Sequence, residues 1–204
     1  EARELARKTG LKIPKLKDCK IHLNGGSAEG EKTMIFLTEG QSAAGSMVSA
    51  RDVRYQAIYS LKGKPLNCHG EKISRIYKNE ELYNIMRALG VEESMDGLRY
   101  NKIVLATDAD VDGLHIRNLL LTFFLTYFEA LVLNGHVYIL ETPLFRVRDA
   151  RRTIYCYSER EKAEALEAIG PKAEITRFKG LGEISPKEFG QFIGPDMRLK
   201  QVQV

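Results

Sequence analysis

An apolar run that ends in three acidic residues constrains the fold of this chain more than any other feature. Ile103–Ala106 is short, continuously apolar and rich in branched side chains, which is typical of a strand buried on both faces of a parallel sheet. Asp108, Asp110 and Asp112 follow it at alternate positions. Open α/β sheets bind their ligands at the carboxyl ends of their strands. The stretch therefore predicts a ligand site at the end of a buried strand.

The three carboxylates need something that neutralises them. Carboxylates this close together repel one another and raise one another's pKa unless a cation or several donors lie among them. Oxygen ligands favour Mg²⁺, Mn²⁺ or Ca²⁺ over zinc or copper. An EF-hand is excluded, because its loop needs a Glu at the twelfth position and that position, counted from Asp108, is Leu119. A solvated acidic turn without an ion remains the alternative.

A second predicted strand also ends in an acid. The segment Thr33–Thr38 has the composition of a core strand and is followed by Glu39. A lone Glu at such a place is often only a helix-start carboxylate that interacts with the helix dipole. Neighbouring strands of a parallel sheet, however, bring their carboxyl ends to the same edge. We therefore expect Glu39 to lie beside Asp108 and Asp110, in an α/β fold whose parallel sheet is flanked by helices.

The remaining segments divide the chain into an arm, a sheet domain and a tail. Residues 1–31 begin with a short charged helix, contain repeated Gly and Pro breaks, and are predicted to form an N-terminal arm or linker. Residues 32–174 are predicted to form the metal-binding α/β domain, and residues 175–204 a small C-terminal tail segment. Further helices are predicted at residues 42–51, with Ser42 as the cap, at 78–89, with Asn79 as the cap, at 158–169, and from residue 185 onward, with a capping box of Ser185 and Glu188. Further strands are predicted at residues 136–140, 142–147, 153–157 and 173–178.

Composition and charge narrow the class of protein only a little. A net charge of +4 permits a basic surface for nucleic acid and does no more than permit it. Three cysteines lie far apart and form no metal-ligand pattern, which predicts reduced thiols and a cytoplasmic location. The apolar run at 119–133 is too short to span a membrane, and no signal peptide is recognisable.

Basic side chains lie between the two strands that end in acids. Lys62 and Lys64 flank Gly63 in a predicted turn, and Arg51 precedes them. Such side chains bind phosphate groups without regard to base sequence. A solvated basic loop accounts for the same pattern, so both interpretations stay open.

Six motifs, taken together, resemble one family. They are TEGQSAAG (38–45), LKGKPLN (61–67), LRYNKI (98–103), TDADVDGLHIRNLLLTFF (107–124), GHVYI (135–139) and RFKGLGE (177–183). Over essentially its whole length the chain resembles the TOPRIM region of the B subunits of bacterial type IIA DNA topoisomerases, which comprise gyrase and topoisomerase IV, with topoisomerase IV the nearer of the two. TDADVDG and RFKGLGE are the most specific of these blocks. The resemblance implies a Rossmann-like TOPRIM fold.

The same resemblance implies a catalytic metal site. Glu39, Asp108 and Asp110 would hold one or two Mg²⁺ ions, for which Mn²⁺ or Ca²⁺ can substitute, and Asp112 would suit a second ion. Glu39 would also act as a general acid or base for the departing 3′ oxygen. The implied phosphate contacts are Arg51, Lys62, Lys64 and Lys179, and the residues implied to orient the carboxylates or the DNA are His115 and Arg117.

Partners follow from the resemblance as well. In the family the nucleophilic tyrosine belongs to the A subunit, and two A and two B subunits form an A2B2 heterotetramer that cleaves and rejoins double-stranded DNA and is a target of quinolones. No membrane is involved. The ATPase domain that precedes this region in the family is missing from the sequence, so the chain alone is expected to be inactive and not to hydrolyse ATP.

Two residues depart from the family pattern, and two alternative functions remain. Gln41 and Ala44 stand where the family usually has Asp and Gly, which removes one implied acid and alters a position implied to contact drugs. A haloacid dehalogenase-type phosphatase would make Asp108 a nucleophile, but it leaves Glu39 and residues 177–183 without a role. A non-catalytic docking platform for the A subunit and DNA accounts for the same motifs.

Overall fold

A six-stranded mixed sheet forms the centre of the molecule. The computed structural model describes residues 12–204, so the helix expected near the N-terminus lies outside the described residues. The strand order is β1-β3-β2-β4-β5-β9, in which β3, β2, β4 and β5 run parallel and the two edge strands run antiparallel to their neighbours. These strands are β1 (Leu16–Lys17), β2 (Met34–Glu39), β3 (Gln56–Leu61), β4 (Lys102–Ala106), β5 (Val137–Leu140) and β9 (Leu199–Gln201).

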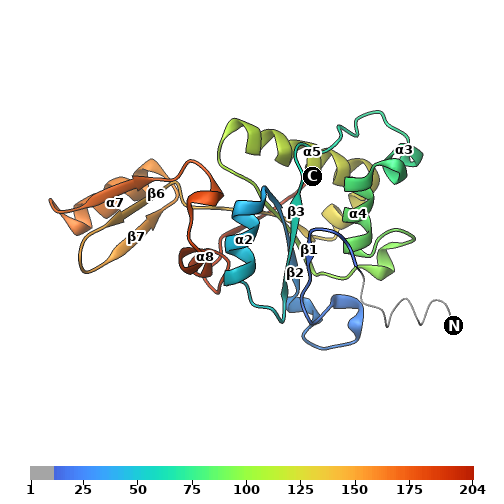
Figure 1. Cartoon of the computed structure of the whole chain (residues 1–204), viewed down its shortest axis with the longest axis horizontal. Coiled ribbons are helices and arrows are strands. Elements are labelled where there is room, and N and C mark those ends of the chain that lie inside the picture. Colours follow the sequence, from blue (N-terminus) through green and yellow to red (C-terminus); the bar gives the residue numbers. More distant parts are fainter. Residues whose placement is uncertain (1–11) are drawn as a thin grey trace.

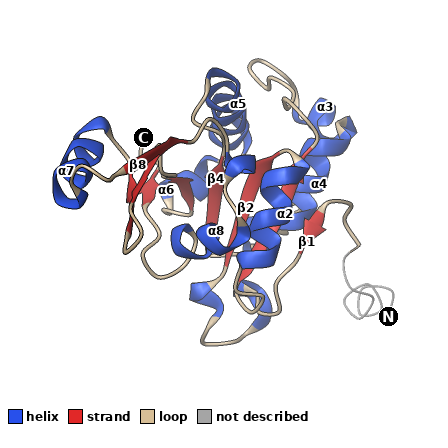
Figure 2. Cartoon of the chain, turned by 60° about the vertical axis from the view of Figure 1, so that its left-hand side comes forward, coloured by secondary structure: helices blue, strands red, loops and turns tan. Residues whose placement is uncertain are grey.

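Both faces of this sheet are buried because successive side chains of each strand point to opposite sides. In β2, Ile35 and Leu37 pack into one core and Phe36 packs into another. The first core is covered by α4, α5 and α6, and the second by α2 and α8 (Figure 2). The helices are α2 (Gln41–Ala50), α3 (Ile73–Lys78), α4 (Glu80–Leu89), α5 (Val111–Tyr127), α6 (Glu129–Leu133), α7 (Glu159–Ile169) and α8 (Pro186–Phe192). The expected α/β sandwich of helices around a largely parallel sheet is confirmed.

A small lobe projects from one end of the molecule (Figure 1). It contains α7 and an antiparallel sheet of order β7-β6-β8, built from β6 (Phe145–Arg148), β7 (Thr153–Cys156) and β8 (Glu174–Arg177). The chain enters the lobe after β5 and returns after β8 to form α8 and β9. The predicted division at residue 174 therefore falls at the first residue of β8, a strand that pairs with β6.

The segment after residue 11 packs onto the sheet instead of extending from it. β1 pairs with β3, and Ile13 and Cys19 are buried in the core. Asp18 accepts hydrogen bonds from the Tyr100 hydroxyl, at 2.5 Å, and from the Arg99 guanidinium. This contact ties the segment to the residues that lead into β4.

Most helix boundaries follow the local capping chemistry, with one error. The Asn79 side chain accepts a hydrogen bond from the Leu82 N–H, and Ser185 forms a capping box with Glu188, as the sequence predicts. Ser42, in contrast, does not cap α2, so that prediction is wrong. The N-cap is Gly40, whose φ of 72° only glycine adopts easily, and Ser42 lies inside the first turn.

Three strands of the main sheet are not predicted from the sequence: β3, β9 and the two-residue β1, which lies in the predicted arm. No apolar pattern predicts β3, because Gln56 and Ser60 interrupt it although both are buried. β9 is too short to show a period. Within residues 12–204, no helix is both long enough and apolar enough to cross a membrane.

Replacing Asp18 by Asn tests how firmly the first segment is held. Burial alone would raise the pKa of Asp18, but hydrogen bonds from His22, Tyr100 and Arg99 outweigh it and hold the pKa well below its usual value. A carboxylate with a depressed pKa stabilises the fold above its unfolded pKa and loses that effect as the pH falls. We expect Asp18→Asn to lower the free energy of unfolding by about 3 kcal/mol at neutral pH, measured by urea denaturation.

The difference between wild type and Asp18→Asn should shrink below a pH of about 4, where the unfolded carboxyl begins to protonate. Exposed Asp196 supplies the matched control, and Asp196→Asn should change stability by less than about 0.5 kcal/mol. Equal effects of the two substitutions would show that the Asp18 contacts do not stabilise this segment.

Candidate metal centre

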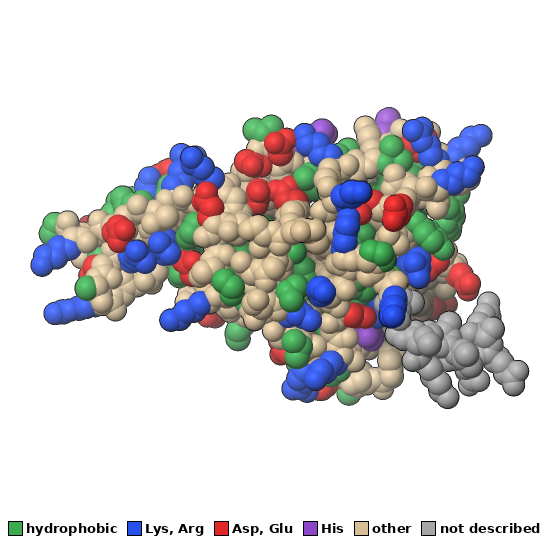
Figure 3. All heavy atoms as spheres, viewed as in Figure 1, with side chains coloured by type: hydrophobic (Ala, Val, Ile, Leu, Met, Phe, Trp, Pro, Cys, Tyr) green, Lys and Arg blue, Asp and Glu red, His purple; other side chains and the backbone are tan. Residues whose placement is uncertain are grey.

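Strand pairing brings three acidic side chains to one edge of the main sheet. β2 and β4 are parallel neighbours with Thr38 opposite Ala106, so Glu39 and Asp108 follow at the same edge. Glu39, Asp108 and Asp110 each offer one oxygen within 4.8 Å of the others. The Asp108 backbone N–H also donates to Glu39 Oε1 at 2.9 Å. Figure 3 shows acidic side chains gathered where α2 and α5 begin.

The turn after β4 is shaped by a cap and a glycine. Asp110 is the N-cap of α5 and accepts a hydrogen bond from the Gly113 N–H at 2.7 Å. A Cβ on Gly113 would lie 2.1 Å from the carbonyl oxygen of Asp108, so only glycine fits there. One oxygen of Asp110 is thus used by the cap, and the carboxylate remains in the acidic cluster.

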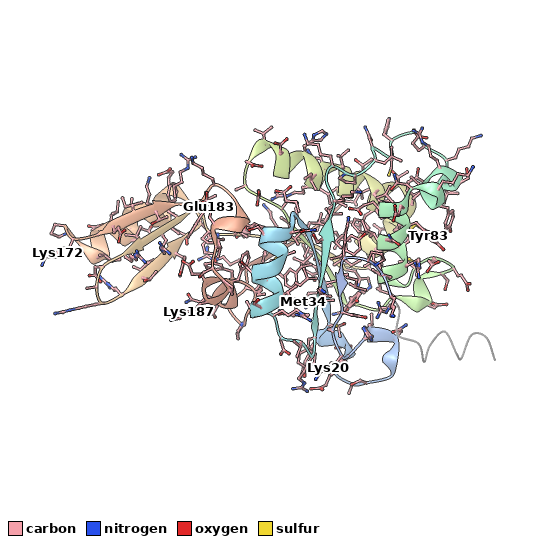
Figure 4. The ribbon with its side chains drawn as sticks, viewed as in Figure 1. Lys20, Met34, Tyr83, Lys172, Glu183 and Lys187 are labelled. Carbon is pink, nitrogen blue, oxygen red and sulfur yellow. The ribbon has the colours of Figure 1, made fainter. Side chains whose placement is uncertain are left out.

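A loop from the far end of the sequence holds Asp108 in place. The Leu181 N–H, in the turn Leu181–Glu183, donates to Asp108 Oδ1 at 2.7 Å. A Cβ on Gly180 would lie 2.9 Å from Asp108 Oδ2, and one on Gly182 would lie 3.1 Å from Ser42 Oγ of α2. Glu183, labelled in Figure 4 between the lobe and α2, accepts from the Lys179 N–H and closes this loop.

Crowding of the acids changes the proton affinity of Glu39. Burial, together with the nearby carboxylates of Asp108 and Asp110, raises the pKa of Glu39 to about 7, although the Asp108 N–H opposes this shift. Near neutral pH Glu39 is therefore poised between its protonated and ionised forms. A carboxyl group in this state can donate or accept a proton.

Asp112 is not part of this cluster. Its side chain is 72% exposed and forms an ion pair with Lys64, 2.7 Å away, whose hydrogen bond lowers the pKa of Asp112. The contact joins the turn after β3 to the first turn of α5. Binding of a cation by Asp112 would therefore compete with Lys64.

The basic residues predicted to contact phosphate differ in whether their side chains are already bound to other parts of the chain or are exposed to solvent. Arg51 donates to the backbone carbonyl oxygens of Val48, Gln56 and Asp18, so its guanidinium fastens the end of α2 to neighbouring segments. The other three residues predicted to contact phosphate have side chains that are exposed to solvent; they are Lys62, Lys64 and Lys179.

The two residues predicted to orient the site lie on α5. His115 is exposed, while Arg117 is half-buried and its Nε has no hydrogen-bond partner among the described residues. Neither side chain forms a hydrogen bond with Glu39, Asp108 or Asp110 in the described structure, and their predicted role remains a prediction.

Comparison with known proteins identifies the fold family. The Toprim domain family matches residues 34–142, the segment that contains β2, β4 and all the clustered acids. The chain belongs to the Toprim domain family. The phosphatase alternative finds no support in this match.

Several relatives of this Toprim chain are known. It is 68% identical to the B subunit of DNA topoisomerase 4 from Borreliella burgdorferi, over 95% of the chain and 32% of that relative. It is 40% identical to the B subunit of DNA gyrase from Thermus thermophilus, over 100% of the chain and 34% of that relative. The chain thus spans about a third of the length of these proteins. The DNA-binding, cleavage and re-ligation domain of Plasmodium falciparum topoisomerase II has a similar structure, with a TM-score of 0.76 and 27% identity over 90% of the chain and 26% of that structure.

The donor set of the Toprim acid cluster suits a hard divalent cation. Glu39, Asp108 and Asp110 offer only carboxylate oxygens, which Mg²⁺ and Mn²⁺ prefer. Asp18, Cys19 and His22 form a second group close enough to share an ion. There, however, the Arg99 guanidinium already pairs with Asp18, so a cation would be repelled.

Sequence reasoning missed the groups that hold the Toprim acids in position. Leu181 acts through its backbone N–H, which no side-chain pattern reveals. Gly113 and Gly180 act by lacking a Cβ. The sequence contains one signal for these groups, namely the glycines directly after the acidic turn and within RFKGLGE. Glycine often marks a close approach of the backbone to another group.

Glu39→Gln tests the raised pKa. The folded-state pKa of about 7 lies above the unfolded value near 4.3, so between these pH values the folded chain binds more protons and its stability falls as the pH rises. In EDTA we expect Glu39→Gln to stabilise the chain at pH 8 by about 1 to 2 kcal/mol, after allowance for solvent screening, and to have little effect near pH 4. Denaturant unfolding at both pH values measures this. A destabilised variant at pH 8 would contradict the shift.

Gly180→Ala tests the contact between the loop and Asp108. Gly180 has a φ of −150°, which alanine adopts freely, so any effect must come from the new Cβ beside the carboxylate. We expect a loss of about 1 to 3 kcal/mol in the free energy of unfolding. The matched control is Gly190→Ala in α8, where a Cβ meets nothing within 4 Å, and it should be neutral or slightly stabilising. If both variants change the free energy of unfolding equally, the contact between residue 180 and the Asp108 carboxylate is not tight.

Proposed function

We propose that this chain is the metal-binding part of the B subunit of a type IIA DNA topoisomerase. In this role it supports cleavage and rejoining of double-stranded DNA by the tyrosine of a partner A subunit, within an A2B2 assembly whose ATP is bound by another region. The observation that carries the proposal is the convergence of Glu39, Asp108 and Asp110 at the ends of two parallel strands. The similarity to the B subunits of topoisomerase 4 and gyrase supports it.

The acid cluster would hold the catalytic cation. Glu39, Asp108 and Asp110 would bind Mg²⁺, or Mn²⁺ or Ca²⁺ in its place. Such an ion supplies positive charge to the phosphodiester oxygens and to the departing 3′ oxygen. The Leu181 N–H, which donates to Asp108, would keep that carboxylate in place for the ion. Asp112 would contribute to a second ion only after its pair with Lys64 opens.

Glu39 would also handle the proton of the reaction. Its pKa of about 7 allows the carboxyl group to deliver a proton to the 3′ oxygen as DNA is cleaved and to remove it as DNA is rejoined. A bound cation would lower that pKa, so Glu39 would act on protons only while it is not a direct ligand.

Exposed lysines would place the DNA backbone near the acids. Lys62 and Lys64 lie on the turn after β3, and Lys179 lies on the loop that touches Asp108. Phosphate contacts give affinity without sequence preference, as a strand-passing enzyme needs. Arg51, which is committed to backbone carbonyls, would contribute to the surface only indirectly.

Two measurements on one set of variants test this proposal. The chain alone should bind Mn²⁺, detected by electron paramagnetic resonance, and Asp108→Ala should weaken binding by about tenfold or more, because one charged ligand is lost. The chain mixed with its A subunit, DNA and Mg²⁺ should form covalent tyrosine–DNA products that Asp108→Ala abolishes. Exposed Asp96 provides the control, and Asp96→Ala should match the wild type in both assays.

The outcomes separate catalysis from docking. Cleavage that survives Asp108→Ala would reject the catalytic role and leave the chain as a docking platform for the A subunit and DNA. Loss of cleavage without loss of Mn²⁺ binding would mean that Asp108 acts other than as a metal ligand.

A further inference from the structure

A polar cavity lies between the main sheet and the small lobe. Its volume is about 440 Å³, and its walls come from the end of β4, from α5, from the exit of β5, from the start of α7 and from β9. The charged side chains that line it are Arg117, Glu141, Glu161, Arg198 and Lys200, and hydroxyl groups are supplied by Thr107, Thr142 and Tyr157. Glu39, Asp108 and Asp110 do not line it, but Ala109, which lies between two of these acids, does, so the cavity adjoins the acid cluster without including its carboxylates.

Two groups in this cavity wall lack a partner. Of the four buried side-chain polar atoms without a hydrogen bond in the described residues, two are Arg117 Nε and Thr107 Oγ1. Thr107 is only 2% exposed. A buried polar group left unsatisfied costs about 1 to 3 kcal/mol, and more when it is charged. An acceptor placed in the cavity would remove this cost.

Arg117 is also without a counter-ion. No residue within 12–204 forms a salt bridge or hydrogen bond with its guanidinium, whereas Arg198, which lines the same cavity, is paired with Glu161 at 3.0 Å and stacks on the Tyr157 ring. Burial lowers the pKa of Arg117, which reflects the same lack of compensation. The guanidinium nevertheless remains charged at any physiological pH.

The charged side chains that line the cavity have a net charge of +1, which one negative charge on a ligand would neutralise. The lining contains three cationic side chains and two carboxylates, and Arg198 is already neutralised by Glu161. Among the side chains that line the cavity, Glu141 is then the one carboxylate left to balance Arg117 and Lys200. Their donors and the Thr107 hydroxyl come from three different elements, which are α5, β9 and the end of β4. Guanidinium groups bind phosphate oxygens in bidentate fashion.

We propose that this cavity binds a singly charged phosphate group, with Arg117 as its principal donor. Lys200 and the Thr107 hydroxyl complete the contacts, and Glu141 keeps the preferred charge of the ligand low. The phosphate can belong to a small molecule or to a DNA phosphodiester, since both present the same tetrahedral group. A ligand here contacts β4, α5 and β9 at once and lies against the base of the lobe.

Nuclear magnetic resonance of the arginine Nε–H groups tests the proposal on the chain itself. Inorganic phosphate is titrated in EDTA at a slightly acidic pH, where the ion is mostly singly charged, so the result does not depend on metal binding. We expect a saturable shift of the Arg117 Nε–H signal in the millimolar range and a much weaker response to acetate at equal ionic strength. A shift that rises linearly with phosphate, without saturation, would overturn the proposal.

Matched variants identify the donor. Arg117→Gln should weaken phosphate binding by about tenfold, as judged from backbone amide shifts of Thr107 and Lys200. Arg160→Gln removes an arginine whose side chain is 88% exposed and should leave binding unchanged. If Arg117→Gln does not fold, Lys200→Gln at the exposed edge strand should weaken binding several-fold. Unchanged affinity in the folded variants would refute the site.

A short DNA duplex distinguishes the two sources of phosphate. If DNA shifts the Arg117 signal and inorganic phosphate competes with it, the ligand is the DNA backbone. If DNA shifts only the signals of exposed basic residues such as Lys62 while phosphate still saturates Arg117, the site accepts a small phosphate compound.

Discussion

Parallel pairing of β2 with β4 is the constraint on which the rest of this structure depends. It places Glu39 and Asp108, which are 69 positions apart in sequence, within one hydrogen bond of each other. The buried apolar residues of both strands make this register costly to shift, because a slip by one residue would turn each strand's side chains to the wrong face. The burial of these apolar side chains therefore offsets the cost of gathering like charges at the ends of the strands.

The acids are gathered by strand pairing and then positioned by backbone groups. The Leu181 N–H fixes Asp108, the Gly113 N–H fixes Asp110, and the Asp108 N–H fixes Glu39. Each acid thus keeps an oxygen available beyond its backbone contact. A site held by peptide groups on rigid elements loses little freedom when it binds a cation, which is the condition for precise coordination.

The features of the fold and of the acid cluster that can be predicted from the sequence are those that depend on residues close together in the chain. Apolar runs identify β2 and β4, capping chemistry identifies α4 and α8, and acids at strand ends indicate that Glu39, Asp108 and Asp110 meet. β3 stays hidden because burial of Gln56 and Ser60 depends on partners distant in sequence, such as the Ile193 carbonyl oxygen that accepts from Gln56. The placement of Arg51 and Asp112 is equally unpredictable, since each follows from contacts that only the folded chain creates.

The way in which the small lobe is joined to the main sheet matters for the acid cluster. The lobe is joined to the main sheet by two chain crossings, and the returning one runs from β8 directly into the loop that touches Asp108. Only residues 178–180 separate the end of β8 from Leu181, so a short stretch of chain connects the lobe to the N–H group that holds Asp108. The turn between β6 and β7 lies at the outer end of the lobe, away from the acid cluster (Figure 1).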